Sequence, residues 1–408
     1  MLKLINRIVA FSVMFCLVFE QSGFAQVAPD MGVPAYLSGL LSPDRFRPVH
    51  LRSLSYDQAS NSYDLLIEQG TSRNLKEPQV KDSTQKLMEY FETGLRLPNS
   101  MFWVNLRPDA PDQIIDPYLS RTDLGKALLE ADLQLKKDIA RFTSPDTKGG
   151  RAYWNMIYAK AEEMFGQQDV SIPTVTRPWI VPGEVIIKEY KDGAYVYKAT
   201  MKVMLEQDYL KDSPGYQFDD PRLKELNAYS SQLVRELILP QLTREVNSSK
   251  RYAGLRQVFY SIILAQWFKT KYASNTELAN ARGFDSRDLS GLTSKIAWSK
   301  EKYYQDYRRS FEQGEYNKQE TVRSDNGIVV RQYFSGGILL PLSQNAIPGQ
   351  VPVMTVIQAG VNAQPALAAG LTANANSYSI SVNGAQARIR VLPSVKDNAV
   401  KEDDNKPQ

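Results

Sequence analysis

The sequence predicts an α+β fold, with mixed helices and antiparallel hairpins in one main body and a low-charge C-terminal extension that ends in a β-hairpin. Hydrophobic residues recur every three or four positions in several long segments, which is typical of amphipathic helices. In other segments they alternate every second position on both sides of short polar turns, which is typical of hairpins. Finally, residues 332–387 hold no Asp, Glu, Lys or Arg in 56 consecutive positions, so this part differs from the charged body before it.

The chain opens with a segment typical of a secretory signal peptide. Two basic residues, Lys3 and Arg7, precede an apolar stretch over residues 8–19. This stretch is too short to span a bilayer, which needs about 20 residues, but it matches the apolar core of a signal peptide. Small residues then place the cleavage between Ala25 and Gln26. We expect residues 1–25 to be the signal peptide, residues 26–46 a linker, and the protein to be periplasmic, envelope-associated or extracellular.

Cleavage would leave a nearly neutral mature chain without cysteine. Cys16 is the only cysteine, and the loss of Lys3, Arg7 and Glu20 lowers the formal net charge from +4 to +3. Disulfides and thiolate metal sites are therefore excluded from the mature chain, whose stability must come from a buried core. The even charge balance gives no signal for nucleic acid, and we expect no nucleic-acid partner and no transmembrane span in the mature chain.

The main body, residues 47–335, is expected to begin with a hairpin and then to become helical. Strands over residues 49–56 and 62–68 should pair through a polar turn at Asn61. Apolar positions at helical spacing predict a helix over residues 80–97 and, after Pro98, residues 101–106 should form a strand.

Ser120 and Asp123 are expected to act as a capping pair for the clearest amphipathic helix of the chain. Leu124, Leu128, Ala131, Leu135 and Ile139 make its apolar stripe. On the same helix, the spacing of Asp132 and Lys136 predicts an ordinary surface ion pair. A second helix should cover residues 151–165 and end at Gly166.

A second hairpin is expected over residues 184–190 and 194–205, with the longer strand second and with Asp192-Gly193 as the turn residues that tolerate positive φ. A long helical pattern follows Pro221, and Pro240 should kink or end it. Residues 252–272 should form a helix that is buried, since it is apolar on nearly every face. A last helix near residues 299–313 precedes a strand at residues 328–334.

The C-terminal part is expected to be a linker, a hairpin and a tail. Residues 336–376 are rich in Ala, Gly, Asn and Gln and lack a helical stripe, which favours an uncharged low-complexity linker. Residues 377–395 alternate about Asn383-Gly384, a strong hairpin signal. Residues 396–408 resemble a disordered tail in composition.

Chemistry that depends on histidine has a single candidate, His50. A Ser/His/Asp triad would have to use it, and zinc sites with two or three histidines are excluded. A structural role for His50 is the favoured interpretation. The sequence holds no HExxH, GxGxxG or GxSxG motif, and we expect no cofactor and no metal.

Two penicillin-binding signatures occur in the expected order, but the third is absent. Residues 83–86 match SxxK and residues 324–326 match SDN, whereas no KTG-like strand follows. Ser83 is better interpreted as the start of a helix.

Carboxylate pairs are the remaining route to catalysis, because two of them can divide the acid and base roles. The sequence does not select a pair. The candidates are Asp109, Asp112, Asp116, Asp219, Asp220, Glu236 and Glu245.

Two clusters of aromatic and basic residues are candidates for ligand contact. Arg177 and Trp179 form one, and Tyr304 and Arg308 belong to the other, where Tyr303 and Tyr307 follow a stripe that is more typical of a core.

Three segments resemble a group of uncharacterised exported bacterial proteins of unknown function. They are residues 129–137 (LEADLQLKK), 176–182 (TRPWIVP) and 255–257 (LRQ). The resemblance covers about residues 47–338, and it implies no activity, cofactor or site residue.

These observations favour an exported, non-catalytic binding or scaffold protein of the bacterial cell envelope. Its uncharged C-terminal extension would contact a protein or envelope partner through its strand edges. The alternative is a carboxylate-dependent, glycosidase-like hydrolase that acts on an envelope or extracellular polymer.

Overall fold

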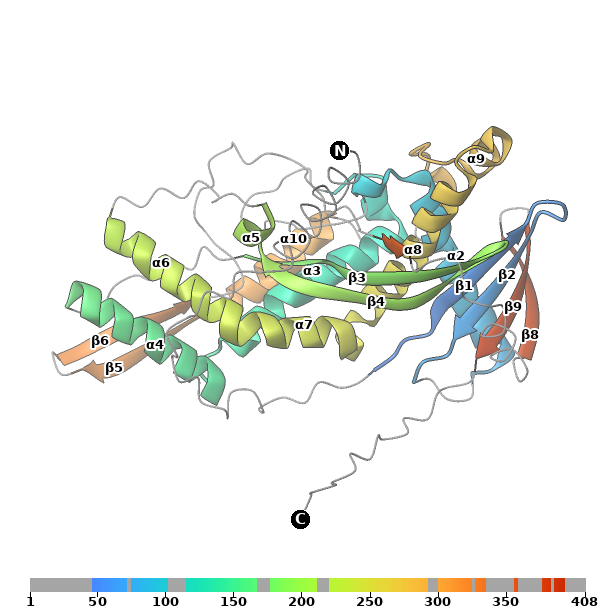
Figure 1. Cartoon of the computed structure of the whole chain (residues 1–408). Coiled ribbons are helices and arrows are strands. Elements are labelled where there is room, and N and C mark those ends of the chain that lie inside the picture. The colour runs from blue at the N-terminus through green and yellow to red at the C-terminus, as the bar shows by residue number, and fades with distance from the viewer. Residues whose placement is uncertain are drawn as a thin grey trace, which may run out of the picture. The chain divides into compact units, whose positions relative to one another are not determined.

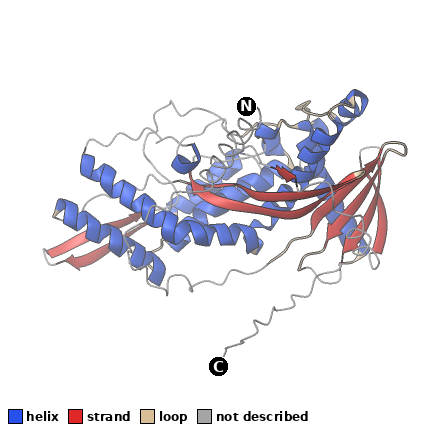
Figure 2. Ribbon diagram, viewed as in Figure 1, coloured by secondary structure: helices blue, strands red, loops and turns tan. Residues whose placement is uncertain are grey.

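A computed structural model of the chain describes residues 46–71, 75–101, 115–166, 177–210, 220–292, 300–313, 315–324, 327–334, 356–358, 376–382 and 385–392. The chain divides into two units, Met1–Ser42 and Pro43–Gln408, and every described residue belongs to the second. Helices and a mixed sheet confirm the predicted α+β class (Figures 1 and 2). The predicted signal peptide, with its cleavage between Ala25 and Gln26, lies outside the described residues, as does Cys16.

The strands of the second unit are β1 His50–Asp57, β2 Ser62–Glu68, β3 Pro178–Tyr190, β4 Gly193–Leu205, β5 Asn317–Ser324, β6 Gly327–Phe334, β7 Val356–Gln358, β8 Asn376–Val382 and β9 Ala385–Leu392. A mixed sheet has the order β7-β3-β4-β1-β2-β9-β8, and β5 and β6 form a separate hairpin. Neighbouring strands are antiparallel except for β3 with β7 and β2 with β9, which are parallel.

The helices are α2 Glu77–Arg96, α3 Asp123–Phe142, α4 Lys148–Phe165, α5 Glu206–Leu210, α6 Pro221–Leu233, α7 Leu239–Ser248, α8 Ala253–Tyr272, α9 Thr276–Arg282 and α10 Lys300–Glu312. A π-helical turn, Val234–Ile238, joins α6 to α7, and Pro240 lies in the first turn of α7. The helical pattern after Pro221 is thus interrupted by a π turn just before Pro240, and it does not end there. Within the described residues, no helix combines the length and the apolar character that crossing a bilayer requires.

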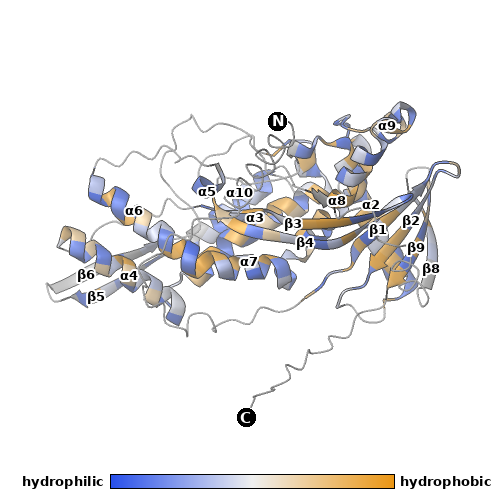
Figure 3. Cartoon of the chain, in the orientation of Figure 1, coloured by the Kyte–Doolittle hydropathy of each residue, from blue (hydrophilic) through white to orange (hydrophobic). Residues whose placement is uncertain are grey.

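The sheet has one apolar and one polar face where β1, β2 and β9 run side by side. Leu54, Leu65 and Ile389 are fully buried on the apolar face, against which α2 and α8 pack. A cluster of rings closes this core, with Phe268 at 5.6 Å from Phe91 and 6.1 Å from Tyr63 between centroids. The burial of α8 that its sequence predicts is thus confirmed. Figure 3 shows further hydrophobic residues where α3 lies beside β3.

The C-terminal hairpin is confirmed, and it lies inside the main sheet. Its apolar residues, Ala385, Ala387, Ile389 and Val391, are all buried. Strand β9 is held between β2 and β8, so the hairpin completes the core of the body. The uncharged segment before it also contributes a strand, because β7 pairs in parallel with Val185–Ile187 of β3.

The first two predicted hairpins are present, but the second has a different turn. Tyr190 pairs directly with Gly193, so Lys191 and Asp192 are the turn residues, and both strands have 13 residues. Gly193 does not adopt a positive φ, so the reason expected for this glycine was wrong. A side chain there would meet Ser55 and the Tyr190 ring at 2.5–2.6 Å, so close packing requires this glycine.

One local prediction around the first helices was also wrong, and another lies mostly outside the described residues. Thr122, not Ser120, caps α3, because its hydroxyl accepts a hydrogen bond from the Gly125 amide at 3.0 Å. The Ser120 hydroxyl instead donates to the Pro117 carbonyl. Met101 ends a 3-10 turn where a strand was expected to start, and residues 102–106 lie outside the described residues.

The hairpin of β5 and β6 packs on α4, and only β6 was predicted. Arg151 of α4 forms an ion pair with Glu320 of β5 at 2.9 Å, and Lys318 forms another with Asp146. Tyr333 of β6 contacts Trp154 of α4, with their ring centroids 5.5 Å apart. Strand β5, with the sequence NKQETVRS, has too little apolar character to be recognised by alternation.

Candidate functional site

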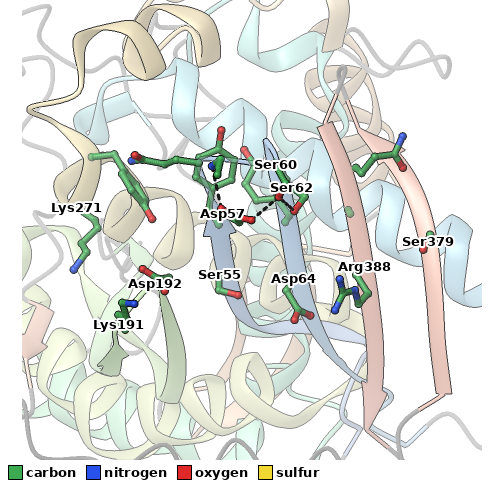
Figure 4. A pocket seen from close by; sticks show the side chains of 17 residues that line it. Ser55, Asp57, Ser60, Ser62, Asp64, Lys191, Asp192, Lys271, Ser379 and Arg388 are labelled. Carbon is green, nitrogen blue, oxygen red and sulfur yellow. Dashed lines mark hydrogen bonds between the residues drawn. The ribbon is translucent and has the colours of Figure 1, made fainter.

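A groove of about 820 Å³ lies at the end of the sheet where three hairpins come together. Its walls come from the β1–β2 turn, the β3–β4 turn, the hairpin of β8 and β9, and the end of α8. Figure 4 shows serine, aspartate, lysine and arginine side chains from these elements around the same space. The groove therefore presents hydroxyl groups and charges of both signs.

Strand register places one row of polar side chains across the groove. Ser55 pairs with Asp64, Asp64 with Arg388, and Arg388 with Ser379. Directly opposed residues project from the same face of a sheet, so these four lie on one face. The apolar residues that alternate with Arg388 along β9, such as Ala387 and Ile389, project into the core instead. The alternation that builds the core thus also builds the floor of the groove.

The β1–β2 turn is fixed by its own polar residues. Asp57 accepts hydrogen bonds from the Ala59 amide at 3.0 Å and from the Ser60 hydroxyl at 2.6 Å. The Ser60 hydroxyl and the Ala59 amide lower the pKa of Asp57, which keeps this carboxylate an anion. Asn61 adopts φ 48°, a conformation that asparagine tolerates better than most residues. The turn predicted at Asn61 is confirmed.

Beneath the turn, Arg282 of α9 joins it to the core. Its guanidinium lies 5.1 Å from the ring centroid of Tyr63 and 5.7 Å from that of Tyr56. It also donates to the Asn61 side-chain oxygen at 2.5 Å, which accepts a second hydrogen bond from the Tyr56 hydroxyl. Tyr56 and Tyr63 line the groove, so α9 positions its inner wall.

Glu92 of α2 is a buried carboxyl group near this inner wall. It is 5% exposed, and its Oε2 accepts no hydrogen bond from the described residues. Burial raises the pKa of Glu92 to about 7, although Arg96 and Arg282 oppose the shift. A negative charge on this carboxylate contributes to raising the pKa of Tyr63, which lines the groove.

We expect Glu92→Gln to stabilise the protein at pH 8 and to have little effect at pH 5. The folded-state pKa lies above the ordinary value of 4.5, so stability is highest below pH 4.5 and is lost as the pH rises through 7. The loss amounts to about 3 kcal/mol, which the neutral amide should largely recover. Urea unfolding at the two pH values measures the difference. Asp82→Asn, at an exposed acid on the same helix, is the control, and an equal effect of Glu92→Gln at both pH values would contradict the assignment.

His50 has a structural environment, as its sequence context favours. Its Nδ1 lies 2.9 Å from the Pro48 carbonyl oxygen, and its Nε2 lies 3.4 Å from Glu68 Oε2. Arg52 approaches the same Glu68 oxygen at 3.4 Å. Burial opposes ionisation here, but His50, Arg52 and Arg47 lower the pKa of Glu68 to about 2. No serine is placed against His50 by the described contacts, and His50 does not line the groove.

The residues predicted to contact ligand lie elsewhere in the fold. Arg177 precedes β3, where its guanidinium lies 3.8 Å from the buried Glu206. Trp179 is the second residue of β3 and packs on Tyr209, with ring centroids 5.5 Å apart. Tyr304 and Arg308 lie on α10, where Arg308 is exposed. None of these four residues lines the groove.

The candidate carboxylates have mostly local roles. Asp116 accepts hydrogen bonds from the Tyr118 and Leu119 amides, Asp220 caps α6 and pairs with Arg222, and Glu236 accepts from Gln232. Asp109, Asp112 and Asp219 lie outside the described residues.

Glu245 belongs to a network of two buried carboxylates and two more-exposed arginines that the sequence did not indicate. Arg251 lies 2.6 Å from Glu245 and 3.5 Å from Asp138, and Arg141 approaches the same two carboxylates at 3.5 and 3.4 Å. Tyr252 also donates to Asp138 at 2.9 Å. Burial raises the pKa of Asp138, although both arginines oppose the shift. Two carboxylates held by two arginines connect α3 to α7, and neither carboxylate lines the groove.

The penicillin-binding interpretation has no support in the fold. Ser83 lies in the middle of α2, six residues after its first residue Glu77, so its expected role at a helix start was wrong. Ser324 ends β5, and Asp325 and Asn326 lie outside the described residues.

The described residues contain no group of three or more His, Cys, Asp or Glu side chains that suits a metal ion. The chain matches none of the protein-family models, curated proteins or solved structures with which it was compared. Two of the segments that carry the resemblance to exported proteins hold buried charges. Asp132 and Lys136 form a buried pair, and Arg256 donates to the Val246, Phe46 and Ser249 carbonyls.

Proposed function

We propose that the protein is an exported, non-catalytic binding protein of the bacterial cell envelope, and that the groove at the end of the sheet is its ligand site. The observation that carries the proposal is the row Ser55, Asp64, Arg388 and Ser379, which presents both donors and acceptors along one cavity of about 820 Å³. A cavity of this size with a few convergent polar groups is typical of ligand sites.

The groove is poorly suited to the alternative function, a carboxylate-dependent hydrolase. Such an enzyme needs one carboxyl group that stays protonated to act as an acid. Asp57 has a lowered pKa. Asp64 accepts two hydrogen bonds from Arg390, at 3.1 and 2.9 Å. Asp57 therefore favours the anionic form, and the Asp64 carboxylate already serves as a hydrogen-bond acceptor for Arg390, an arrangement that suits the binding of a polar ligand.

Export rests on the N-terminal segment and has its own test. The mature protein should begin at Gln26, because the apolar core and the small residues before this position match a signal peptide. N-terminal sequencing of the protein isolated from the cell envelope and from the cytoplasm measures this. A cytoplasmic protein that still begins at Met1 would contradict the proposal.

Filling the groove should abolish binding. Gln386 is exposed and lines the groove, and a strand accommodates tryptophan well, so Gln386→Trp should occupy the cavity without unfolding the sheet. We expect co-sedimentation of the mature protein with isolated envelope material to fall at least tenfold. Gln232→Trp on α6, outside the groove, should leave it unchanged.

The same assay separates binding from catalysis. Release of soluble fragments from the envelope material by the unmodified protein, but not by Asp64→Asn, would favour the hydrolase. Equal sedimentation of the two tryptophan variants would show that the groove is not the ligand site.

A further inference from the structure

The groove holds three cationic side chains for which the described residues provide no partner. Lys191, Lys271 and Arg388 are exposed and line the cavity, and no hydrogen bond or ion pair to them is present in the described part of the chain. The acids of the groove are less available. Asp57 is bound by its own turn, and Asp64 is held by Arg390.

Asp192 is the remaining acid, and it lies next to Lys191 in the β3–β4 turn. Three cationic side chains without a partner among the described residues therefore line the groove together with one carboxylate, Asp192, that is likewise without one. The groove has an excess of positive charge for a ligand, although its lining as a whole contains three acids and three bases.

The cations lie at opposite ends of the groove. Lys191 and Lys271 lie together beside Asp192, whereas Arg388 lies beyond Ser55 and Asp64 (Figure 4). Three strand spacings, from β4 through β1 and β2 to β9, separate Gly193 from Arg388. Adjacent strands lie about 4.8 Å apart, so the two ends are roughly 14 Å apart. A ligand that contacts both ends must be extended and must carry at least two separated negative charges.

The strands beneath the groove favour a polysaccharide over a peptide. Extended peptides gain affinity by adding a strand to a free sheet edge. At the groove, Ser55, Asp64 and Arg388 belong to inner strands whose main chains already pair on both sides, whereas Ser379 lies on β8, the edge strand. Recognition across the floor of the groove must therefore use side chains, and the hydroxyls of Ser55 and Ser62 with the carboxylate of Asp192 suit the many hydroxyl groups of a sugar chain.

We propose, on the basis of the binding function above, that the groove takes a linear polysaccharide with carboxylate groups on its sugars. Lys191 and Lys271 hold a carboxylate at one end, and Arg388 holds another at the opposite end. Arginine suits this role because its planar guanidinium matches the carboxylate geometry.

Titration calorimetry of the mature protein with oligogalacturonates of increasing length tests the proposal. Affinity should rise at least tenfold at the length that first spans the two ends, and the gain should weaken as salt is raised from 50 to 500 mM. Arg388→Gln and the double variant Lys191→Gln/Lys271→Gln should each remove this gain. Lys224→Gln, an exposed lysine on α6, should not.

Neutral malto-oligosaccharides of the same lengths should bind at least tenfold more weakly. Equal affinity for the neutral sugars, or tighter binding of poly-glutamate, would overturn the acidic-polysaccharide proposal. If Gln386→Trp also abolished the binding of that other ligand, the groove would remain a ligand site and only the ligand class would be wrong. An unchanged affinity for oligogalacturonate in Gln386→Trp would overturn the use of the groove itself.

Discussion

Deletion of residues 376–408 should abolish cooperative folding of the main body. Strand β9 lies between β2 and β8, and its side chains Ala387 and Ile389 are buried against the same core as Leu65. Without the hairpin, the main chain of β2 loses its parallel partner and the apolar face of α2 loses part of its cover. We expect circular dichroism to show no sharp thermal transition, or a transition at a much lower temperature.

Smaller changes control for this deletion. Removal of residues 397–408 alone should leave the transition unchanged, since β9, the last strand of the described residues, ends at Leu392. Ile389→Ala should lower the free energy of unfolding by about 2–5 kcal/mol. Arg388→Gln, on the opposite face of the sheet, should change it by less than about 0.5 kcal/mol. A normal transition after deletion of residues 376–408 would show that β9 does not stabilise the body. Because deletion disturbs the core, point variants are the better test of partner binding by the C-terminal part.

Asp132→Ala should destabilise the protein by about 3–5 kcal/mol, far more than a surface ion pair would. The expectation of a surface pair was wrong, because Asp132 is 4% and Lys136 8% exposed. Asp132 Oδ2 accepts hydrogen bonds from the Lys136 ammonium and the Tyr303 hydroxyl, both at 2.6 Å. Its removal leaves a buried ammonium and a buried hydroxyl without this acceptor. The midpoint of urea unfolding measures the loss.

A combined variant shows whether the unpaired charge causes that loss. Asp132→Leu, Lys136→Leu and Tyr303→Phe together should recover most of the stability, because apolar groups replace the whole buried network. Glu130→Ala on the same helix should cost less than about 0.5 kcal/mol, since Glu130 is exposed and lies 3.8 Å from Lys126. A loss as small for Asp132→Ala as for Glu130→Ala would contradict the assignment.

Hydrophobic periodicity predicted most of the helices and strands, because the buried face of a regular element recurs at a fixed spacing in the sequence. The stripe of α3, the apolar run of α8 and the alternation of β9 each reflect one buried face, which the sequence displays directly. Periodicity does not say which faces meet. The predicted cap of α3 was two residues from Thr122 and the predicted turn of β3 and β4 was one residue from the observed one, and β5 has no apolar alternation to recognise.

The groove could not be predicted, although all three of its hairpins were. Asn61, Asp192 and Asn383 each indicated a hairpin, but only the strand order brings those hairpins to one end of the sheet. Lys191, Lys271 and Arg388 are ordinary surface residues in the sequence and come from three distant segments. The buried pair of Asp132 and Lys136 was misjudged for a related reason, since i,i+4 spacing gives the partner and not the burial.

The pairing of β2 with β9 also determines when the body can finish folding. Asp64 and Arg390, which join the two strands, are separated by 326 residues. At 5–20 residues per second, β2 leaves the ribosome roughly 15 to 65 s before its partner exists. During that time one edge of β2 and the part of α2 that packs on β8 have no partner. The sheet of the body therefore cannot be completed before the last strands of the chain have been synthesised.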